Sequence, residues 1–177
     1  WKPDGKALLF ASGMESGKDR FNKLFLVPKE GGLPKALPLP YAEFGALSPD
    51  GKVLAYQPVS TDFRTWKRYR GGMAARLYTS PAGTSDLKRV LPAETAGLFS
   101  PTWVGERIVF TSDLGDDPQV QAQVWSVNAS GRDLRRHTAH GPADGYVRDA
   151  TSDGKVVVYH ARGDLYQLAS LKAEPQK

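Results

Sequence analysis

Short apolar stretches recur along the chain, and most of them end in an aromatic side chain. Residues 47–56 show the pattern best: an apolar residue, the turn sequence Ser-Pro-Asp-Gly, a lysine, and a second apolar run that ends at Tyr56. Proline presets φ, aspartate bonds to nearby backbone, and glycine adopts a positive φ without steric cost. The stretch therefore predicts two strands joined by a tight turn.

The same sequence pattern occurs three more times along the chain, which indicates an internal repeat. The turn glycines are spaced 46, 54 and 49 residues apart, and a charged residue follows each one. A second aromatic residue lies in another short apolar run further along each unit. A four-stranded unit that repeats every roughly 40 to 55 residues is typical of a β-propeller blade. The glycines and the aromatics five residues after them are Gly5 with Phe10, Gly51 with Tyr56, Gly105 with Phe110, and Gly154 with Tyr159.

The chain is therefore predicted to be all-β, an incomplete β-propeller of four WD40-like blades of antiparallel strands. The blades are expected at about residues 1–40, 41–92, 93–139 and 140–171, before a polar tail, 172–177, that we expect to be frayed. The inner strand of the first blade and the outer strand of the fourth are expected to be missing. The predicted strands are 6–11, 23–27 and 34–39; 43–47, 53–58, 74–80 and 87–91; 97–100, 107–112, 123–127 and 134–137; 146–150, 156–160 and 164–168.

An open arc of blades leaves two blade faces without a neighbour, and each blade buries its faces against adjacent blades. We therefore expect this chain to meet other blades or domains of a parent protein, or another copy of itself. The surface near Leu8 and Phe10 is the face of the first blade that we expect such a partner to cover.

Three stretches carry a resemblance to a known family. They are Trp66-Lys67-Arg68-Tyr69-Arg70-Gly71-Gly72, then residues 131–138 (Gly-Arg-Asp-Leu-Arg-Arg-His-Thr), then residues 152–159 with 163–166. In order and spacing they resemble the bacterial WD40-like (PD40) repeats of TolB and tricorn-type proteases, and within that group the last four blades of the tricorn six-bladed N-terminal propeller. The first two blades of that propeller have no counterpart here.

The resemblance implies a propeller segment of a large serine peptidase, serving as scaffold and peptide passage near an active site that lies elsewhere in the parent. It implies no catalytic residue in this chain. The family's paired arginines that anchor the substrate's C-terminus precede the matched region, so no substrate-binding residue is carried over. The alternatives are a stand-alone TolB-like interaction propeller, or a fragment that assembles into a larger ring. The resemblance favours the cytoplasm, with the periplasm as the alternative.

Composition excludes several kinds of site and partner. The chain has 177 residues and no cysteine, so disulfides and cysteine metal sites are excluded. No apolar run approaches the roughly 20 residues that span a bilayer, so no membrane partner is predicted. The net charge of +5 could favour acidic partners, but a moderately basic surface is the favoured explanation.

The most unusual composition lies in a basic and aromatic loop within the second blade. Its cations could attract peptide carboxylates, because arginine donates two parallel hydrogen bonds to a carboxylate. Stacking of bases on Trp66 and Tyr69 is a weaker alternative, and no nucleic-acid partner is predicted. An ordered insertion with solvated or paired cations is favoured. The candidate ligand-binding residues are Arg64, Lys67, Arg68 and Arg70.

From the remaining candidate residues we predict neither a metal site nor a cofactor site. Residues 113–117 (Asp-Leu-Gly-Asp-Asp) offer oxygen ligands, but they lack the spacing of a calcium loop and are expected to form a solvated hairpin loop. His137, His140 and His160 are irregularly spaced, so a structural or exposed role is favoured over metal ligation.

Overall fold

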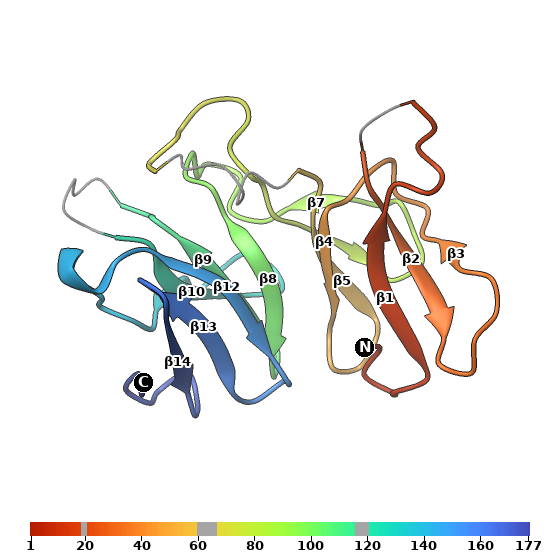
Figure 1. Ribbon diagram of the computed structural model, residues 1–177. Coiled ribbons are helices and arrows are strands. Elements are labelled where there is room, and N and C mark those ends of the chain that lie inside the picture. The colour runs from red at the N-terminus through yellow and green to blue at the C-terminus, as the bar shows by residue number, and fades with distance from the viewer. Residues whose placement is uncertain (19–20, 60–66, 116–120) are drawn as a thin grey trace.

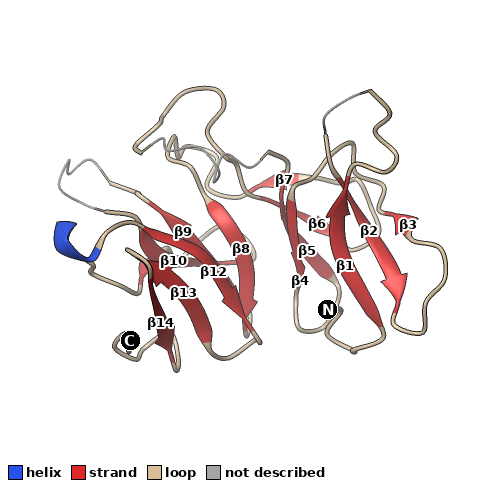
Figure 2. Ribbon diagram, viewed as in Figure 1, coloured by secondary structure: helices blue, strands red, loops and turns tan. Residues whose placement is uncertain are grey.

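The computed structural model describes residues 1–18, 21–59, 67–115 and 121–177, and it is built almost entirely of strands and turns (Figure 2). The strands form four antiparallel sheets, and within the described residues the only helix is a short 3-10 turn at Pro142–Asp144. The predicted all-β propeller class is therefore confirmed. Within the same residues, no helix is long and apolar enough to cross a membrane.

Each sheet is a meander of strands in chain order, as the repeat predicts, and we number the sheets as blades one to four (Figure 1). Blade one is β1 (Ala7–Ser12), β2 (Lys23–Pro28) and β3 (Lys35–Ala36); blade two is β4 (Phe44–Leu47), β5 (Val53–Gln57), β6 (Tyr78–Pro81) and β7 (Lys88–Arg89); blade three is β8 (Phe99–Val104), β9 (Arg107–Ser112), β10 (Gln123–Asn128) and β11 (Arg135–Arg136); blade four is β12 (Val147–Ser152), β13 (Val157–Ala161) and β14 (Asp164–Leu168).

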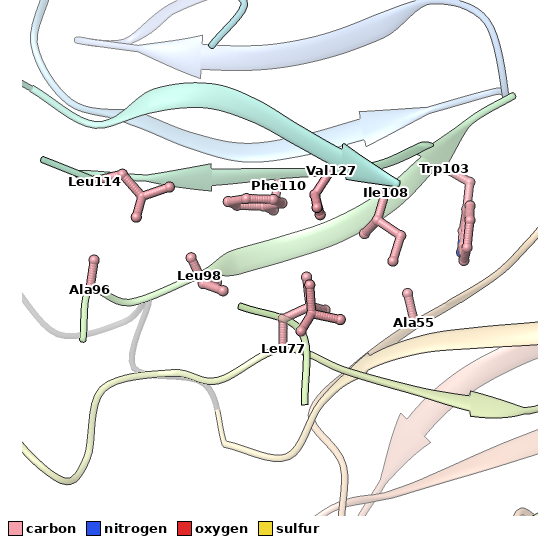
Figure 3. Close-up of a cluster of buried hydrophobic side chains, with 10 residues drawn as sticks. Ala55, Leu77, Ala96, Leu98, Trp103, Ile108, Phe110, Leu114 and Val127 are labelled. Carbon is pink, nitrogen blue, oxygen red and sulfur yellow. The ribbon is translucent and has the colours of Figure 1, made fainter. Parts of the chain in front are cut away.

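The hydrophobic core lies between the blades and not within any one of them. Blades two and three share the largest cluster, in which Phe110 and Ile108 of β9 lie near Leu77 of blade two (Figure 3). A second cluster joins blades three and four, and a third joins blades one and two. The aromatic residue five positions after the turn glycine is buried in blades two, three and four, at Tyr56, Phe110 and Tyr159.

The tight turns that mark the repeat have the geometry that their residues predict. Gly51 has a φ of 70°, and its N–H donates to the carbonyl oxygen of Ser48 at 2.7 Å. The Ser48 hydroxyl donates to Asp50 Oδ1 at 2.6 Å and accepts from the backbone N–H of Val53 at 2.9 Å. Side chain and backbone together close the turn between β4 and β5.

The inner strand of blade three differs from its predicted bounds, 97–100. It begins at Phe99 and runs on to Val104, because a β-bulge at Ser100, with a φ of 52°, shifts the register between Phe99 and Thr102. Proline 101 lies inside this bulge, where its missing N–H costs no ladder hydrogen bond.

The outer parts of the blades are shorter than predicted. The outer strands β3, β7 and β11 have two residues each, and β6 starts at Tyr78 instead of residue 74. Ala74 and Ala75 are buried all the same, and the carbonyl oxygen of Ala75 accepts a hydrogen bond from the N–H of Leu98 in blade three. These residues are apolar because they are buried at a blade interface, so their pattern resembles that of a strand although they do not form the hydrogen-bond ladder of one.

The two end blades have three strands each, as predicted, but the C-terminal tail is not frayed. Gln176 pairs with Gln167 of β14 through two backbone hydrogen bonds of 2.7 and 2.9 Å, and Lys177 forms an ion pair with Asp164 at 2.8 Å. A polar segment can occupy the outer edge of a sheet because the edge needs only backbone partners.

Candidate functional site

The inner strands of the blades face a common hollow of about 800 Å³. Its wall consists of β4, residues 100–103 of β8, residues 149–152 of β12, and the N-terminal segment that leads into β1. The hollow is thus axial, as in a propeller, and its volume is in the range of small-molecule and peptide sites, roughly 300–1,000 Å³.

Two matching bulges shape this wall. Ser100 in β8 and Asp149 in β12 both have a φ of 52°, and each lies five residues before the turn glycine of its blade. Both strands shift their register at that point. Bulges re-aim side chains, and the backbone N–H of Ser100 donates to Gln57 Oε1 at 3.3 Å. The two bulges therefore give the inner strands of blades three and four the same local change of register where they line the hollow.

One carboxylate of the wall is paired with a histidine. The Asp149 carboxylate accepts a hydrogen bond from His160 Nε2 at 2.7 Å, and both side chains are partly exposed. Within the described ranges, no group of three His, Cys, Asp or Glu side chains could hold a metal ion.

The cationic loop of blade two reaches across blade three to blade four. We call residues 67–71 the strap; in Figure 1 the yellow segment that contains them extends over the side of the molecule where β9 and β12 lie. The backbone N–H of Arg68 donates to Asp113 Oδ2 at 2.7 Å, and Arg70 Nη1 forms an ion pair with Asp113 Oδ1 at 2.9 Å. The Lys67 ammonium lies 5.7 Å from the centre of the Tyr146 ring.

The candidate ligand-binding residues are therefore brought together only in part. Lys67, Arg68 and Arg70 gather around Asp113 and Tyr146, whereas Arg64 lies outside the described residues. The Lys67 side chain is exposed, and the guanidinium of Arg70 is held against Asp113.

The sequence predicts a solvated hairpin loop at residues 113–117, but Asp113 is only 3% exposed. Residues 116–117 lie outside the described residues. In addition to Arg68 and Arg70, Asp113 accepts a hydrogen bond from the hydroxyl of Tyr146 at 2.5 Å. A buried carboxylate of this kind requires charged or hydrogen-bonding partners. Burial, and then the hydrogen bond to Asp113, raise the pKa of the Tyr146 phenol, which keeps it protonated as the donor.

Each of the three histidines has a hydrogen-bond partner. His137 Nδ1 donates to the carbonyl oxygen of Leu171 at 2.7 Å, and His137 Nε2 lies 2.7 Å from the Ser126 hydroxyl. His140 Nε2 lies 2.7 Å from the hydroxyl of Tyr159. Burial lowers the pKa of both His137 and His140 below its ordinary value. His160 completes the set through its contact with Asp149.

The sequence did not identify the residues that shape the axial wall or the residue that holds the strap. Ser100 and Asp149 could have been found by aligning the repeats on their glycines, since both occupy the same repeat position. Asp113 directly follows the buried strand β9, and its composition gave no sign that partners from two other blades cover it.

Four antiparallel sheets in a meander, buried blade against blade around an axial hollow, define a β-propeller of the WD40-like type. The chain belongs to the family of the tricorn protease N-terminal beta propeller domain, whose model matches residues 1–174.

Two curated relatives are similar over most of the chain. Tricorn protease homolog 1 of Streptomyces coelicolor is 35% identical over 181 residues, which cover 100% of this chain and 16% of that protein. The tricorn protease of Thermoplasma volcanium is 25% identical and covers 91% of this chain and 17% of its own length. The chain thus corresponds to a minor part of these relatives.

Two solved structures share the fold. TolB from Acinetobacter baumannii superimposes with a TM-score of 0.68 at 16% identity, over 99% of this chain and 41% of TolB. The tricorn protease superimposes with a TM-score of 0.59 at 19% identity, over 100% of this chain and 22% of the protease. At these identities the likeness concerns the fold alone.

Proposed function

We propose that this chain is a non-catalytic propeller segment of a tricorn-like serine peptidase, and that it serves as scaffold and peptide passage near the active site of the parent. The observation that carries the proposal is the axial hollow of about 800 Å³, lined by the inner strands β4, β8 and β12. Family membership supports the choice of a peptidase as the parent.

The composition of the wall suits a passage better than a tight binding site. The hollow is lined by small and apolar residues such as Ala46, Leu47 and Ala150 together with hydroxyl groups such as those of Thr102 and Thr151. Backbone and hydroxyl groups recognise the peptide backbone that all substrates share. Sequence-independent and weak contacts let a peptide enter and leave.

We further propose that the cations of the strap attract the carboxylates of passing peptides. Lys67 is the group best suited to this role, because its ammonium is exposed and the ring of Tyr146 holds it in place. Arg70 supports the strap through Asp113, and Arg68 and Arg64 complete the candidate set.

Photo-crosslinking tests the passage with the 177-residue chain itself. An octapeptide that carries a central benzoylphenylalanine and a free C-terminus is irradiated with the protein, and the crosslinks are mapped by mass spectrometry. We expect crosslinks in residues 44–47, 99–104 and 147–152. Crosslinks confined to the outer strands β3, β7 and β11 would overturn the passage.

The same peptide with an amidated C-terminus tests the strap separately. We expect the amide to lose crosslinks near residues 67–71 while it keeps those in the axial wall. The Lys67→Gln variant should reproduce that loss with the free acid. Equal crosslinking of acid and amide at the strap would refute the carboxylate role and leave the passage proposal standing.

Self-assembly into a larger ring is the second candidate, and exposed apolar residues at the two end blades favour it. Leu8 of β1 is 37% exposed and Leu165 of β14 is 69% exposed. A partner copy that covers both would produce an oligomer in size-exclusion chromatography with light scattering. A clean monomer at high concentration contradicts this candidate.

A further inference from the structure

We infer that the strap couples blades two, three and four directly, so that blade four responds to changes in a loop of blade two. In a propeller each blade contacts its neighbours, and coupling between non-adjacent blades normally passes through the blade between them. The strap provides a second, shorter connection. This inference is independent of the proposed function.

The connection begins at a carboxylate whose partners come from other blades. Asp113 follows β9 in blade three and is 3% exposed. Arg70 donates to it twice, from Nη1 to Oδ1 at 2.9 Å and from Nη2 to the backbone carbonyl oxygen at 2.8 Å. Arg68 donates its backbone N–H to Oδ2 at 2.7 Å, and the hydroxyl of Tyr146 donates to the same oxygen at 2.5 Å.

One oxygen of Asp113 therefore joins blade two to blade four. Arg68 belongs to the strap, whereas Tyr146 lies immediately before β12, the inner strand of blade four. A charged acceptor makes hydrogen bonds about twice as strong as neutral ones, and burial strengthens them further. Both donors satisfy the same buried charge, so a change at one donor alters the hydrogen bond of the other.

Cation–π contacts add a direct link that bypasses blade three. The Lys67 ammonium lies 5.7 Å from the centre of the Tyr146 ring, and the guanidinium carbon of Arg148 in β12 lies 5.1 Å from it. Lysine and arginine within about 6 Å of a ring centre are attracted by its π electrons. The strap thus contacts the start of β12 through the ring of Tyr146 as well as through its hydroxyl.

The other end of the strap is also fixed. Arg76 Nη1 donates to the carbonyl oxygens of Thr95 and Ala96, both at 2.9 Å, and Arg76 Nη2 donates to the carbonyl oxygen of Gly71 at 3.5 Å. Thr95 and Ala96 lead into β8, the inner strand of blade three. A segment held at both ends transmits a change in one blade to the next, whereas a loop held at one end would absorb it.

Hydrogen exchange of the 177-residue chain tests the coupling. Asp113→Asn keeps the shape but removes the charge that Arg70, Arg68 and Tyr146 share. We expect at least about tenfold faster exchange of the strap amides and of Val147 and Arg148, since hydrogen bonds to charged groups are worth a factor of about ten or more.

Asp133→Asn is the matched control, because Asp133 forms ion pairs with Arg107 and Arg135 within blade three. Its effect should stay within blade three. If Asp113→Asn accelerates exchange only in blade three, or leaves the strap and β12 unchanged, the inference is wrong.

Tyr146→Phe decides the question if Asp113→Asn does not fold. It keeps the ring and the Arg70–Asp113 ion pair and removes only the hydroxyl that reaches Asp113 from blade four. We expect a changed exchange rate of the Arg68 amide, which shares Asp113 Oδ2 with Tyr146. An unchanged Arg68 amide would contradict the coupling.

Discussion

Removal of the Phe110 side chain should destabilise blades two and three together. Phe110 of β9 is fully buried and lies in the cluster that joins Leu77 and Ala55 of blade two to Ile108 and Leu114 of blade three (Figure 3). Truncation of a buried phenylalanine to alanine costs about 3–5 kcal/mol, from lost burial and the remaining cavity. For a chain of this size, each kcal/mol lowers Tm by about 2–4 °C, so the expected loss is roughly 10 °C.

Urea unfolding of Phe110→Ala, followed by circular dichroism, measures this loss as a change in the free energy of unfolding. Phe110→Leu should lose much less, because leucine refills most of the cavity. Leu33→Ala is the surface control, since Leu33 is 93% exposed, and it should change stability by less than about 0.5 kcal/mol. A loss below about 1 kcal/mol for Phe110→Ala would refute the inter-blade core.

Three further predictions concern the other blade contacts. Gly45→Ala places a Cβ 2.5 Å from Leu24 Cδ1 and should cost about 1–3 kcal/mol in urea unfolding, whereas Gly72→Ala, with nothing within 4 Å, should be tolerated; equal effects would contradict the tight contact of blades one and two. Trp103→Phe removes the 2.9 Å hydrogen bond from the indole to the carbonyl oxygen of Ala46 and should cost about 1 kcal/mol; an unchanged urea midpoint would show that this bond between blades contributes nothing. Burial lowers the pKa of His137 below 6.5, so the unfolded chain binds the proton first, and stability is full above pH 6.5 and falls as the pH drops toward the folded-state pKa. Urea midpoints at about pH 8 and pH 5.5 should therefore differ more in the wild type than in His137→Gln, and an equal difference would exclude His137 as a source.

The repeat predicted the architecture because turn chemistry and strand burial are local properties. Gly51 needs its positive φ whatever surrounds it, and Tyr56 follows at a distance fixed by strand geometry. These signals identified each blade and the meander of its strands. They also predicted the bounds of β9 and β14 without error.

Features that depend on neighbouring blades were not predictable from local pattern. Ala75 is buried like a strand residue although its carbonyl oxygen bonds to blade three, and β6 therefore starts later than its apolar pattern predicts. Asp113 has the sequence context of a solvated loop, but groups from blades two and four cover it. The tail is polar, but its backbone pairs with β14 at Gln176.

The candidate site was predictable in composition but not in arrangement. The concentration of cations at residues 64–70 was visible in the sequence. The structure adds that Arg70 is held by an ion pair to Asp113, whereas the ammonium of Lys67 is exposed beside Tyr146. The axial wall carried no compositional signal, because its features are backbone bulges at Ser100 and Asp149.

A nuclear magnetic resonance titration of the 177-residue chain with an unlabelled octapeptide tests the non-catalytic peptide passage. The amide shifts locate the peptide, and the peptide's own signals report whether it is cleaved. We predict weak, saturable shifts at residues 100–103 of β8 and 149–152 of β12, with the peptide intact. Shifts confined to the outer strands, or cleavage of the peptide by this chain, would contradict a non-catalytic peptide passage.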